Sequence, residues 1–275
     1  MSTNAIAFKD LPLSDNFMFG QVMRDERVSK LFLEALLGRS IAKIEYIDKE
    51  KDLSDTLGAH GIRLDVYIQD QNQTRYNIEM QCVNQKDLER RTRYYQGGID
   101  RNFLERGGDY VDLPESYIIF ICNFDYFHAG LALYERESCI KSTDIRYDDG
   151  SHAIILNCKY QERGDVSNDI LEFLDYIRTN DGQMPVVGGL TKIARKLVEE
   201  VRLDGRKERA YMTYQMQMRD ERRQGRAEGR AEGRAEAYAD MYRQGMLSLE
   251  VAVEHSGGIP QARRVQVSLT DISGN

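Results

Sequence analysis

The chain has 275 residues, enough to bury one sizeable hydrophobic core, and its 41% hydrophobic and 30% charged residues are typical of a soluble globular protein. The longest apolar run, Tyr117 to Cys122, is too short to cross a bilayer, and the first residues lack the features of a secretory signal, so we expect a cytoplasmic protein without a membrane partner. The net charge of −7 excludes a uniformly basic nucleic-acid coat protein, so any DNA binding must rest on local basic patches.

Helical and strand-like patterns alternate through the first two thirds of the chain. Ser14 or Asp15 can cap the first helix and Gly38 can end it, while Gly107 and Gly108 can end the second. This order predicts a mixed α/β sheet with a helix on its face. In chain order, the predicted elements are a helix at 13–38, strands at 43–47, 62–69 and 74–83, a helix at 85–108, strands at 116–124, 130–136 and 153–159, and a helix at 166–179.

The last third of the chain differs from the rest in charge and in pattern. Residues 186–275 hold 16 basic against 13 acidic side chains, whereas residues 1–185 hold 22 against 32. From about Leu190 onward the pattern is almost entirely helical and highly charged. We therefore predict two parts, a folded core over residues 1–185 and a charged helical tail over residues 186–275.

The tail contains the tandem repeat GRAEGRAEGRAE at residues 225–236. On a helix, its period of four places the glycines, the arginines and the glutamates on three separate, slowly drifting stripes. Arg and Glu are never three or four residues apart within it, so it forms like-charge neighbours, and each Gly costs about 1 kcal/mol relative to Ala. Either the repeat is a solvated linker, or its glycine stripe lets another helix approach closely and form a dimer.

The two strands at 62–69 and 74–83 carry acids where strands rarely do. Alternation places Asp65 on one polar face, and it places Glu79 and Gln81 together on the corresponding face of the second strand. If the hairpin loop centres on Asn72, residue i faces residue 144 − i, and Asp65 then lies directly opposite Glu79, with Cβ atoms roughly 5 Å apart. Two such like charges repel unless a proton or a divalent cation lies between them. The alternative is a solvated face of an amphipathic hairpin.

Several motifs in this order resemble one known family. The segment RLDVYIQDQNQTRYNIEMQ at 63–81 resembles the core of the PD-(D/E)XK nuclease superfamily, specifically its branch of recombination-promoting nucleases or PD-(D/E)XK family transposases. LSDNFMFGQVM and LFLEALLG resemble the first helices of that branch, RRTRYYQGGID at 90–100 its R-x-x-Y-Y helix, and SYIIFICNF its next strand. The Gly-Arg-Ala-Glu repeats are similar to the low-complexity tails of such proteins. The resemblance covers roughly residues 8–250.

The resemblance implies a restriction-endonuclease-like fold, a mixed β-sheet core flanked by helices, with a helical C-terminal extension. It implies that residues 1–185 form a nuclease core in which Asp65 and Glu79, with the backbone carbonyl of Met80, hold Mg²⁺, or Mn²⁺ in its place. These hard oxygen ligands suit Mg²⁺, which would acidify a bound water and offset charge on the phosphodiester.

The sequence departs from the superfamily pattern at two positions. Leu64 stands where a proline precedes the Asp, a common replacement, and Gln81 stands where E-x-K has its lysine. The branch that the chain resembles also carries Gln at that position, so we expect a working site in which Gln81 remains a catalytic residue. Because a neutral amide offers less charge than a lysine, we expect nearby basic groups to contribute, with Arg90, Arg91 and Arg93 as the candidates.

Two further candidates each have a structural alternative. Asp15 either supplies a third catalytic acid from the first helix, as the superfamily often does, or only caps that helix. Arg91 and Tyr95, four residues apart on one helical face, either contact DNA phosphate, together with Arg90 and Arg93, or form a packed tyrosine beside a solvated arginine.

The leading hypothesis is a Mg²⁺-dependent DNA endonuclease linked to recombination or mobile elements. We expect a homodimer or higher homo-oligomer, formed through the C-terminal helices, because cutting both strands of a duplex generally needs two active sites. The alternative is a catalytically inactive oligomerisation or DNA-binding module that retains the nuclease fold, which the acidic core and the missing lysine favour.

Overall fold

The computed structural model describes residues 6–52, 63–104 and 108–256. These residues form six strands, seven α-helices and two short 3₁₀ helices. In chain order they are η1 (Phe8–Asp10), α1 (Asn16–Met23), α2 (Glu26–Leu37), β1 (Ile44–Asp52), β2 (Arg63–Asp70), β3 (Arg75–Gln81), α3 (Leu88–Phe103), η2 (Tyr110–Asp112), β4 (Ser116–Cys122), β5 (Leu133–Glu135), β6 (Ser151–Asn157), α4 (Asn168–Thr179), α5 (Gly189–Leu203), α6 (Gly205–Arg243) and α7 (Leu249–Ser256).

The six strands form one mixed sheet in the order β1-β2-β3-β4-β6-β5. The strands β1, β2 and β3 pair antiparallel, the central β3, β4 and β6 pair parallel, and β5 closes the other side antiparallel to β6. Every residue of β4 is buried, as expected for a parallel strand covered on both faces. The carboxyl ends of β3, β4 and β6 therefore meet at one edge of the sheet, and the predicted mixed α/β sheet is confirmed.

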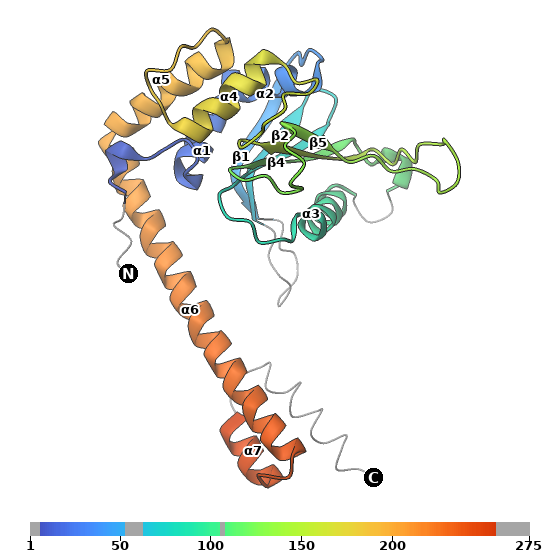
Figure 1. Ribbon diagram of the computed structural model, residues 1–275, viewed down its shortest axis with the longest axis vertical. Helices are drawn as coiled ribbons and strands as arrows, with labels where there is room; N and C mark the ends of the chain where they lie inside the picture. Colours follow the sequence, from blue (N-terminus) through green and yellow to red (C-terminus); the bar gives the residue numbers. More distant parts are fainter. Residues whose placement is uncertain (1–5, 53–62, 105–107, 257–275) are drawn as a thin grey trace. The chain divides into compact units, whose positions relative to one another are not determined.

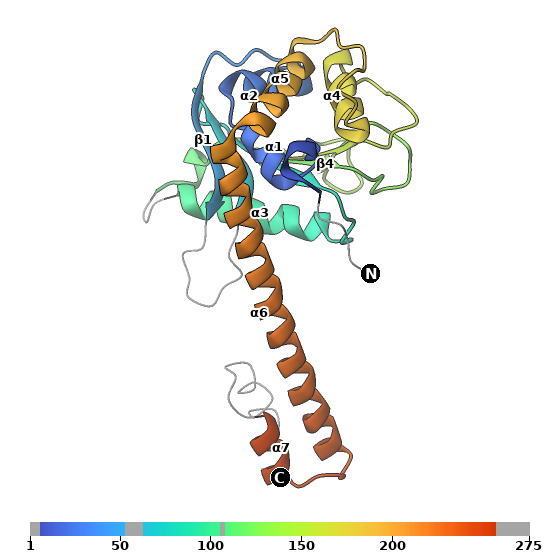
Figure 2. The same ribbon diagram turned by 90° about the vertical axis from the view of Figure 1, so that its left-hand side faces the viewer.

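Helices cover both faces of the sheet, which makes a three-layer core. Figures 1 and 2 show α3 on one side of the strands and α1, α2, α4 and α5 on the other. On that second side the helices also pack against one another, and the rings of Phe32 in α2 and Phe173 in α4 lie 5.8 Å apart. Both faces of the central strands are thus removed from water, so a polar side chain on either face needs partners within the protein.

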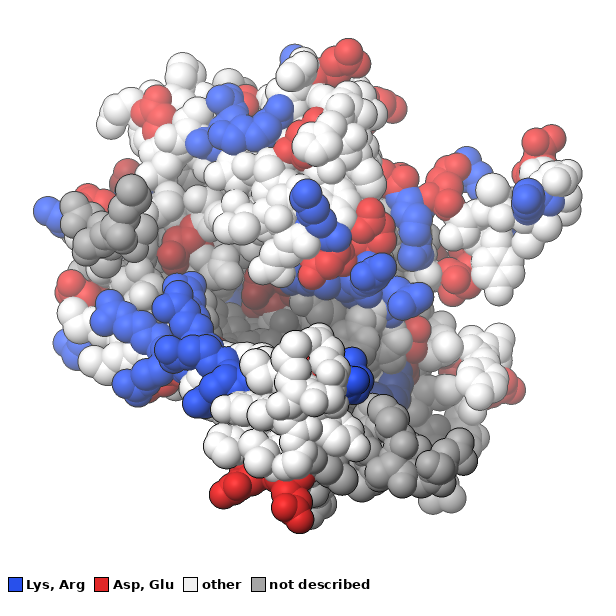
Figure 3. Space-filling model, turned by 60° about the horizontal axis from the view of Figure 1, so that its bottom comes forward, with Lys and Arg blue, Asp and Glu red and all other residues white. Residues whose placement is uncertain are grey.

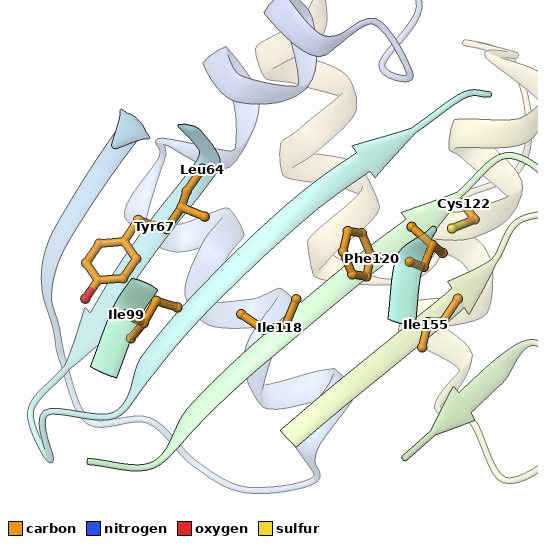
Figure 4. Close-up of a cluster of buried hydrophobic side chains, with 8 residues drawn as sticks. Leu64, Tyr67, Ile99, Ile118, Phe120, Cys122 and Ile155 are labelled. Atoms are coloured by element: carbon orange, nitrogen blue, oxygen red, sulfur yellow. The ribbon is translucent and has the colours of Figure 1, made fainter. Parts of the chain in front are cut away.

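The layer between the sheet and α3 positions the residues discussed below. It contains a cluster of buried apolar side chains from β2, β4, β6 and α3 (Figure 4). Because α3 packs on the same face that carries the strand acids, Glu79 lies in the protein interior and Asp65 is partly buried. The cluster consists of Leu64, Tyr67, Leu88, Ile99, Ile118, Phe120, Cys122 and Ile155.

A side chain in the loop between β2 and β3 holds the hairpin register. The Asp70 carboxylate accepts hydrogen bonds from the backbone N–H groups of Asn72 (2.9 Å) and Thr74 (3.0 Å), and Gln73 adopts a positive φ of 64°. Asp70 is only 2% exposed, and it also accepts a hydrogen bond from the Tyr76 hydroxyl at 2.8 Å. This turn takes the place of the glycine turn that the loop lacks.

Two of the predicted helices have different bounds in the structure. The helix predicted at 13–38 is wrong as a single helix, because it divides into α1 and α2 where Asp25 caps the second one by accepting the N–H of Arg27 at 3.0 Å. Gly38 ends α2 in the left-handed conformation, as predicted. The helix predicted at 85–108 ends earlier, at Phe103, and Gly107, expected to end it, lies outside the described residues.

The chain divides by its internal contacts into two compact units, residues 1–208 and 209–275. Helix α5 packs against α1, α2 and α4 and so belongs to the first unit, later along the chain than the boundary expected at 185/186. The assignment of residues 1–185 to a nuclease domain and of 186–275 to a tail stays a prediction. No helix among the described residues is long and apolar enough to cross a membrane.

Within the second unit, α7 packs back on α6. Ala235, Ala239 and Ala252 are buried there, and the rings of Tyr238 and His255 lie 5.0 Å apart. The GRAE repeat forms a central part of α6, and a Cβ added to any of its three glycines would meet no atom within 4 Å.

Two glycine substitutions are expected to change stability in opposite directions. Gly38→Ala forces a Cβ into the left-handed region (φ 63°) and should lower the free energy of unfolding by about 1 kcal/mol. Gly97→Ala, in the exposed interior of α3 with open space around the new Cβ, should raise it by about 1 kcal/mol. Urea unfolding of both variants and the wild type measures the differences, and equal shifts of one sign would contradict the assigned backbone conformations.

Candidate active site

The candidate site lies where β2 and β3 separate. Their backbone ladder runs from the pair Gln69–Arg75 to the pair Val66–Ile78, which confirms the predicted pairing of residue i with residue 144 − i. Beyond Val66–Ile78, the backbone N–H groups bond to the carboxylates of the two acids. The backbone N–H of Asp65 donates to Glu79 Oε1 at 3.1 Å, and the backbone N–H of Met80 donates to Asp65 Oδ2 at 3.3 Å. Each carboxylate thus binds the backbone of the opposite strand, and both acids lie at the same end of the ladder.

Glu79 is the most enclosed member of this pair, with only 2% of its surface exposed. Its Oε1 accepts hydrogen bonds from the Asp65 backbone and from Asn77 Nδ2, both at 3.1 Å. Its Oε2 accepts from Arg91 Nη2 at 3.2 Å and, more weakly, from Gln81 Nε2 at 3.4 Å. The solvated-face alternative is therefore wrong for Glu79, because it is buried and Arg91 of α3 donates to it.

Burial raises the pKa of Glu79 to about 8, and the nearby charge of Asp65 adds to the increase. The Asp65 backbone N–H, Arg91 and Asn77 act in the opposite direction but do not cancel the cost of removing the charge from water. A cation bound beside it would favour the ionised form.

Arg91, on α3, connects Glu79 to the residues around it. Its Nη1 donates to Gln81 Oε1 at 2.8 Å, while its Nε and Nη2 donate to the Tyr95 hydroxyl at 3.2 Å and 2.8 Å. Its guanidinium carbon lies 5.3 Å from the centroid of the Tyr95 ring and 5.4 Å from that of Phe120. Burial, followed by the charge of Glu79, raises the pKa of Tyr95 to about 12, so Tyr95 remains a neutral acceptor. The predicted solvated arginine is wrong, because Arg91 is packed and only 21% of its side chain is exposed.

Of the other predicted site residues, Met80 lies at the site, whereas Arg90 and Arg93 are exposed on α3. Met80 contributes its backbone, which already contacts Asp65. Arg90 and Arg93 lie on α3 with exposed side chains, on other sides of the helix from Arg91. A phosphate contact by these exposed arginines or by Tyr95 stays a prediction.

Asp15 caps α1, as one of its two predicted roles required. Its Oδ1 accepts the N–H groups of Phe17 at 2.9 Å and Met18 at 3.3 Å. The preceding residue, Ser14, accepts a hydrogen bond from Cys82 at 3.1 Å, which places the start of α1 beside the end of β3. A catalytic role for Asp15 stays a prediction.

Two residues of the site were missed by sequence reasoning. Asn77 is fully buried and orients Glu79 Oε1, and Phe120 from β4 supports the Arg91 guanidinium. Alternation places Asn77 on the same face as Glu79, so a search of that face for amide groups could have found it. No sequence signal marks Phe120, because its place depends on the parallel pairing of β3 with β4, in which it lies opposite Glu79.

The donor set suits a small, hard cation. Two carboxylates and a backbone segment converge at the strand ends, and Mg²⁺ commonly binds proteins through one or two carboxylates, completing its shell with water and phosphate. Glu79 is buried with an uncompensated cost of ionisation, which a divalent cation would offset. Among the described residues, no group of three or more His, Cys, Asp and Glu side chains is arranged to hold a metal ion, so a bound Mg²⁺ would rely on Asp65, Glu79 and Met80.

Comparison with known families agrees with this geometry. Residues 16–184 match the family described as PD-(D/E)XK nuclease family transposase, which is more than half of the chain, and the protein therefore belongs to that family. Its mixed sheet flanked by helices is the restriction-endonuclease-like fold of this family, as predicted. The match includes Asp65, Glu79, Gln81 and Arg91 and begins one residue after Asp15. No curated protein and no solved structure matches the chain.

The raised pKa of Glu79 predicts how stability depends on pH without metal. Between the ordinary glutamate value near 4.5 and about 8, the unfolded chain has lost this proton while the folded chain keeps it, so this group lowers stability as pH rises through that window. Glu79→Gln cannot lose a proton, and its free energy of unfolding should fall less steeply from about pH 5 to about pH 8. Urea unfolding in EDTA measures the slopes. Glu26→Gln, which replaces an exposed glutamate, should keep the wild-type slope, and a wild-type slope in Glu79→Gln would contradict the assignment.

Proposed function

We propose that this protein is a Mg²⁺-dependent DNA endonuclease that hydrolyses phosphodiester bonds, in the cytoplasm and in the context of recombination or mobile elements. The observation that carries the proposal is the convergence of Asp65 and Glu79 at the split end of β2 and β3. Membership of a nuclease family supports the reaction class, and Mn²⁺ is expected to replace Mg²⁺. When bound, the metal would acidify a water molecule and offset charge on the phosphodiester.

The other steps, metal binding and orientation of the ligands, are assigned to residues of the chain. Asp65 and Glu79 hold the cation and the Met80 carbonyl completes the protein ligands, while Asn77 keeps Glu79 aimed at the opening between the strands. Burial under α3 removes water that would otherwise weaken these electrostatic contacts. We keep Asp15, at the start of α1 next to the end of β3, as a candidate third acid.

The proposed partner is DNA, bound through local basic groups because the protein as a whole is acidic. On the face shown in Figure 3, Lys and Arg side chains gather in groups, with Asp and Glu side chains between them. Arg90, Arg93 and Tyr95 on α3 are the proposed phosphate contacts nearest in sequence to Arg91. Contacts of this kind position a backbone without reading its sequence, so we expect cleavage with strong salt dependence.

Substitution of either acid is expected to abolish cleavage. Asp65→Ala and Glu79→Ala should each lower Mg²⁺-dependent nicking or cutting of plasmid DNA by about 100-fold or more, because each removes an anionic ligand. Asp112→Ala, which removes an exposed acid in η2, is the matched control and should cut like the wild type. Cleavage that persists in both site variants would show that a contaminating nuclease produces it.

A metal titration separates the nuclease from an inactive module with the same fold. Calorimetry with Mn²⁺ should give a single-site isotherm for the wild type that disappears in Asp65→Ala. The inactive module predicts no binding above background in either protein, and that result would overturn the proposed function even if the protein binds DNA.

We also propose a homodimer or higher homo-oligomer formed through the C-terminal helices. Support comes from the 39-residue helix α6, in which the three glycines of the GRAE repeat have open space around them and would allow a second helix to approach closely. Within the repeat, Glu228 accepts a hydrogen bond from Gln224 at 2.9 Å and Arg230 donates to the Arg226 carbonyl at 3.1 Å, and no ion pair among the described residues joins its arginines to its glutamates.

Removal of the second compact unit should therefore change the oligomeric state. The full chain is expected to have at least twice the mass of one chain by light scattering, and a chain ending at Glu208, the end of the first unit, should be a monomer. Circular dichroism and the melting temperature verify that the shortened chain is folded. Equal oligomeric states for both would contradict assembly through the helices.

A further inference from the structure

The interaction that distinguishes this site from an E-x-K site is the one between Gln81 and Arg91. Gln81 has two polar atoms, and they make unequal contacts. Its Nε2 lies 3.4 Å from Glu79 Oε2, a long hydrogen bond, whereas its Oε1 accepts from Arg91 Nη1 at 2.8 Å. A lysine at this position has no acceptor and would repel the guanidinium, so the amide is chemically matched to an arginine beside it.

Arg91 is held in one orientation by several groups, while 21% of its side chain stays exposed. The Tyr95 hydroxyl accepts hydrogen bonds from Nε and Nη2 of Arg91, and Gln81 Oε1 accepts one from Nη1. The ring centroids of Tyr95 and Phe120 lie within 5.4 Å of the guanidinium carbon. A flexible surface arginine loses considerable side-chain entropy when it binds a phosphate, whereas this one is already ordered in the folded chain. Pre-ordering of this kind is what a group that stabilises a transition state needs.

The guanidinium also reaches the carboxylate of the candidate metal site. Arg91 Nη2 lies 3.2 Å from Glu79 Oε2, the same oxygen that Gln81 approaches. A positive charge is therefore fixed next to the acid at the position where a strand lysine would place its own. It comes from α3, twelve residues after Glu79, and not from β3 itself.

We propose that Arg91 supplies the cation that E-x-K nucleases take from their lysine, and that Gln81 is a positioning residue that orients Arg91 and does not itself stabilise the transition state. This inference rests on the proposed nuclease function. Arg91 faces the non-bridging oxygens of the phosphodiester and offsets their negative charge as the attacking water adds. In the metal-free protein the same guanidinium lies 3.2 Å from Glu79 Oε2, so it competes with the metal for that carboxyl group.

This double role makes Arg91→Ala diagnostic, because cleavage should fall while metal affinity does not. Without the competing guanidinium, Mn²⁺ affinity measured by calorimetry should stay equal or rise several-fold, while the cleavage rate at saturating Mg²⁺ falls by about 100-fold. If Arg91 only holds Glu79 in place, both quantities fall together, and the proposal is overturned. Arg101→Ala, which removes an exposed arginine from the same helix, is the matched control and should change neither.

A rescue experiment tests the role of Gln81. In the Arg91→Ala background, Gln81→Lys returns a cation to the strand and should recover at least about tenfold of the lost rate. Gln81→Lys alone should not exceed the wild type, because Lys and Arg91 then repel each other. No recovery in the double variant, with Mn²⁺ binding intact, would show that the cation is not interchangeable between the two positions and would overturn the proposal.

Two outcomes keep this inference separate from the proposed function. If the wild type cleaves, Asp65→Ala does not, and Arg91→Ala cleaves at the wild-type rate, the nuclease stands and the role of Arg91 is wrong. If Arg91→Ala does not fold by circular dichroism, Arg91→Lys replaces it. That variant keeps the charge but lacks the planar guanidinium that bonds Glu79, Gln81 and Tyr95 together. We expect an intermediate cleavage rate, with Mn²⁺ affinity at or above that of the wild type. A cleavage rate equal to the wild type would overturn the need for positioning by Gln81.

Discussion

The structure of this site depends on one constraint, the burial of the Glu79 carboxylate between the sheet and α3. A carboxylate removed from water must be protonated, hydrogen-bonded or paired with a cation, and Glu79 has elements of all three. Its raised pKa shows that the protein's own donors do not fully offset the lost hydration. The fold therefore maintains a site whose ionised form is incomplete without an additional positive charge.

The separation of β2 and β3 turns this constraint into a binding geometry. Beyond the pair Val66–Ile78, the N–H groups of Asp65 and Met80 bond to carboxylates instead of to the opposite backbone. Buried backbone groups need partners, so the two acids also satisfy the strands at the point where they diverge. The same bonds hold the two like-charged groups close together across the ladder, which their repulsion would otherwise resist. Strand separation and metal-site geometry are thus two results of one hydrogen-bond arrangement.

Helix α3 contributes the positive charge of the site. It covers the acids with its apolar side and brings Arg91 to Glu79, with Tyr95 and Phe120 around the guanidinium. A superfamily whose usual pattern places a lysine on the strand can tolerate Gln81 if the charge comes from a neighbouring element.

Local patterns in the sequence determined the strands, their register and the pairing of Asp65 with Glu79, because alternation and a short hairpin involve residues close together in the chain. The sequence also marked Arg91 and Tyr95 as neighbours on one helical face. Only the tertiary structure decided that α3 covers the polar face, that Arg91 rather than Arg90 or Arg93 points inward, and that Phe120 lies beside it. These facts depend on how a helix docks on a sheet and on the parallel pairing of β3 with β4, and neither is encoded in the spacing of residues along a single element.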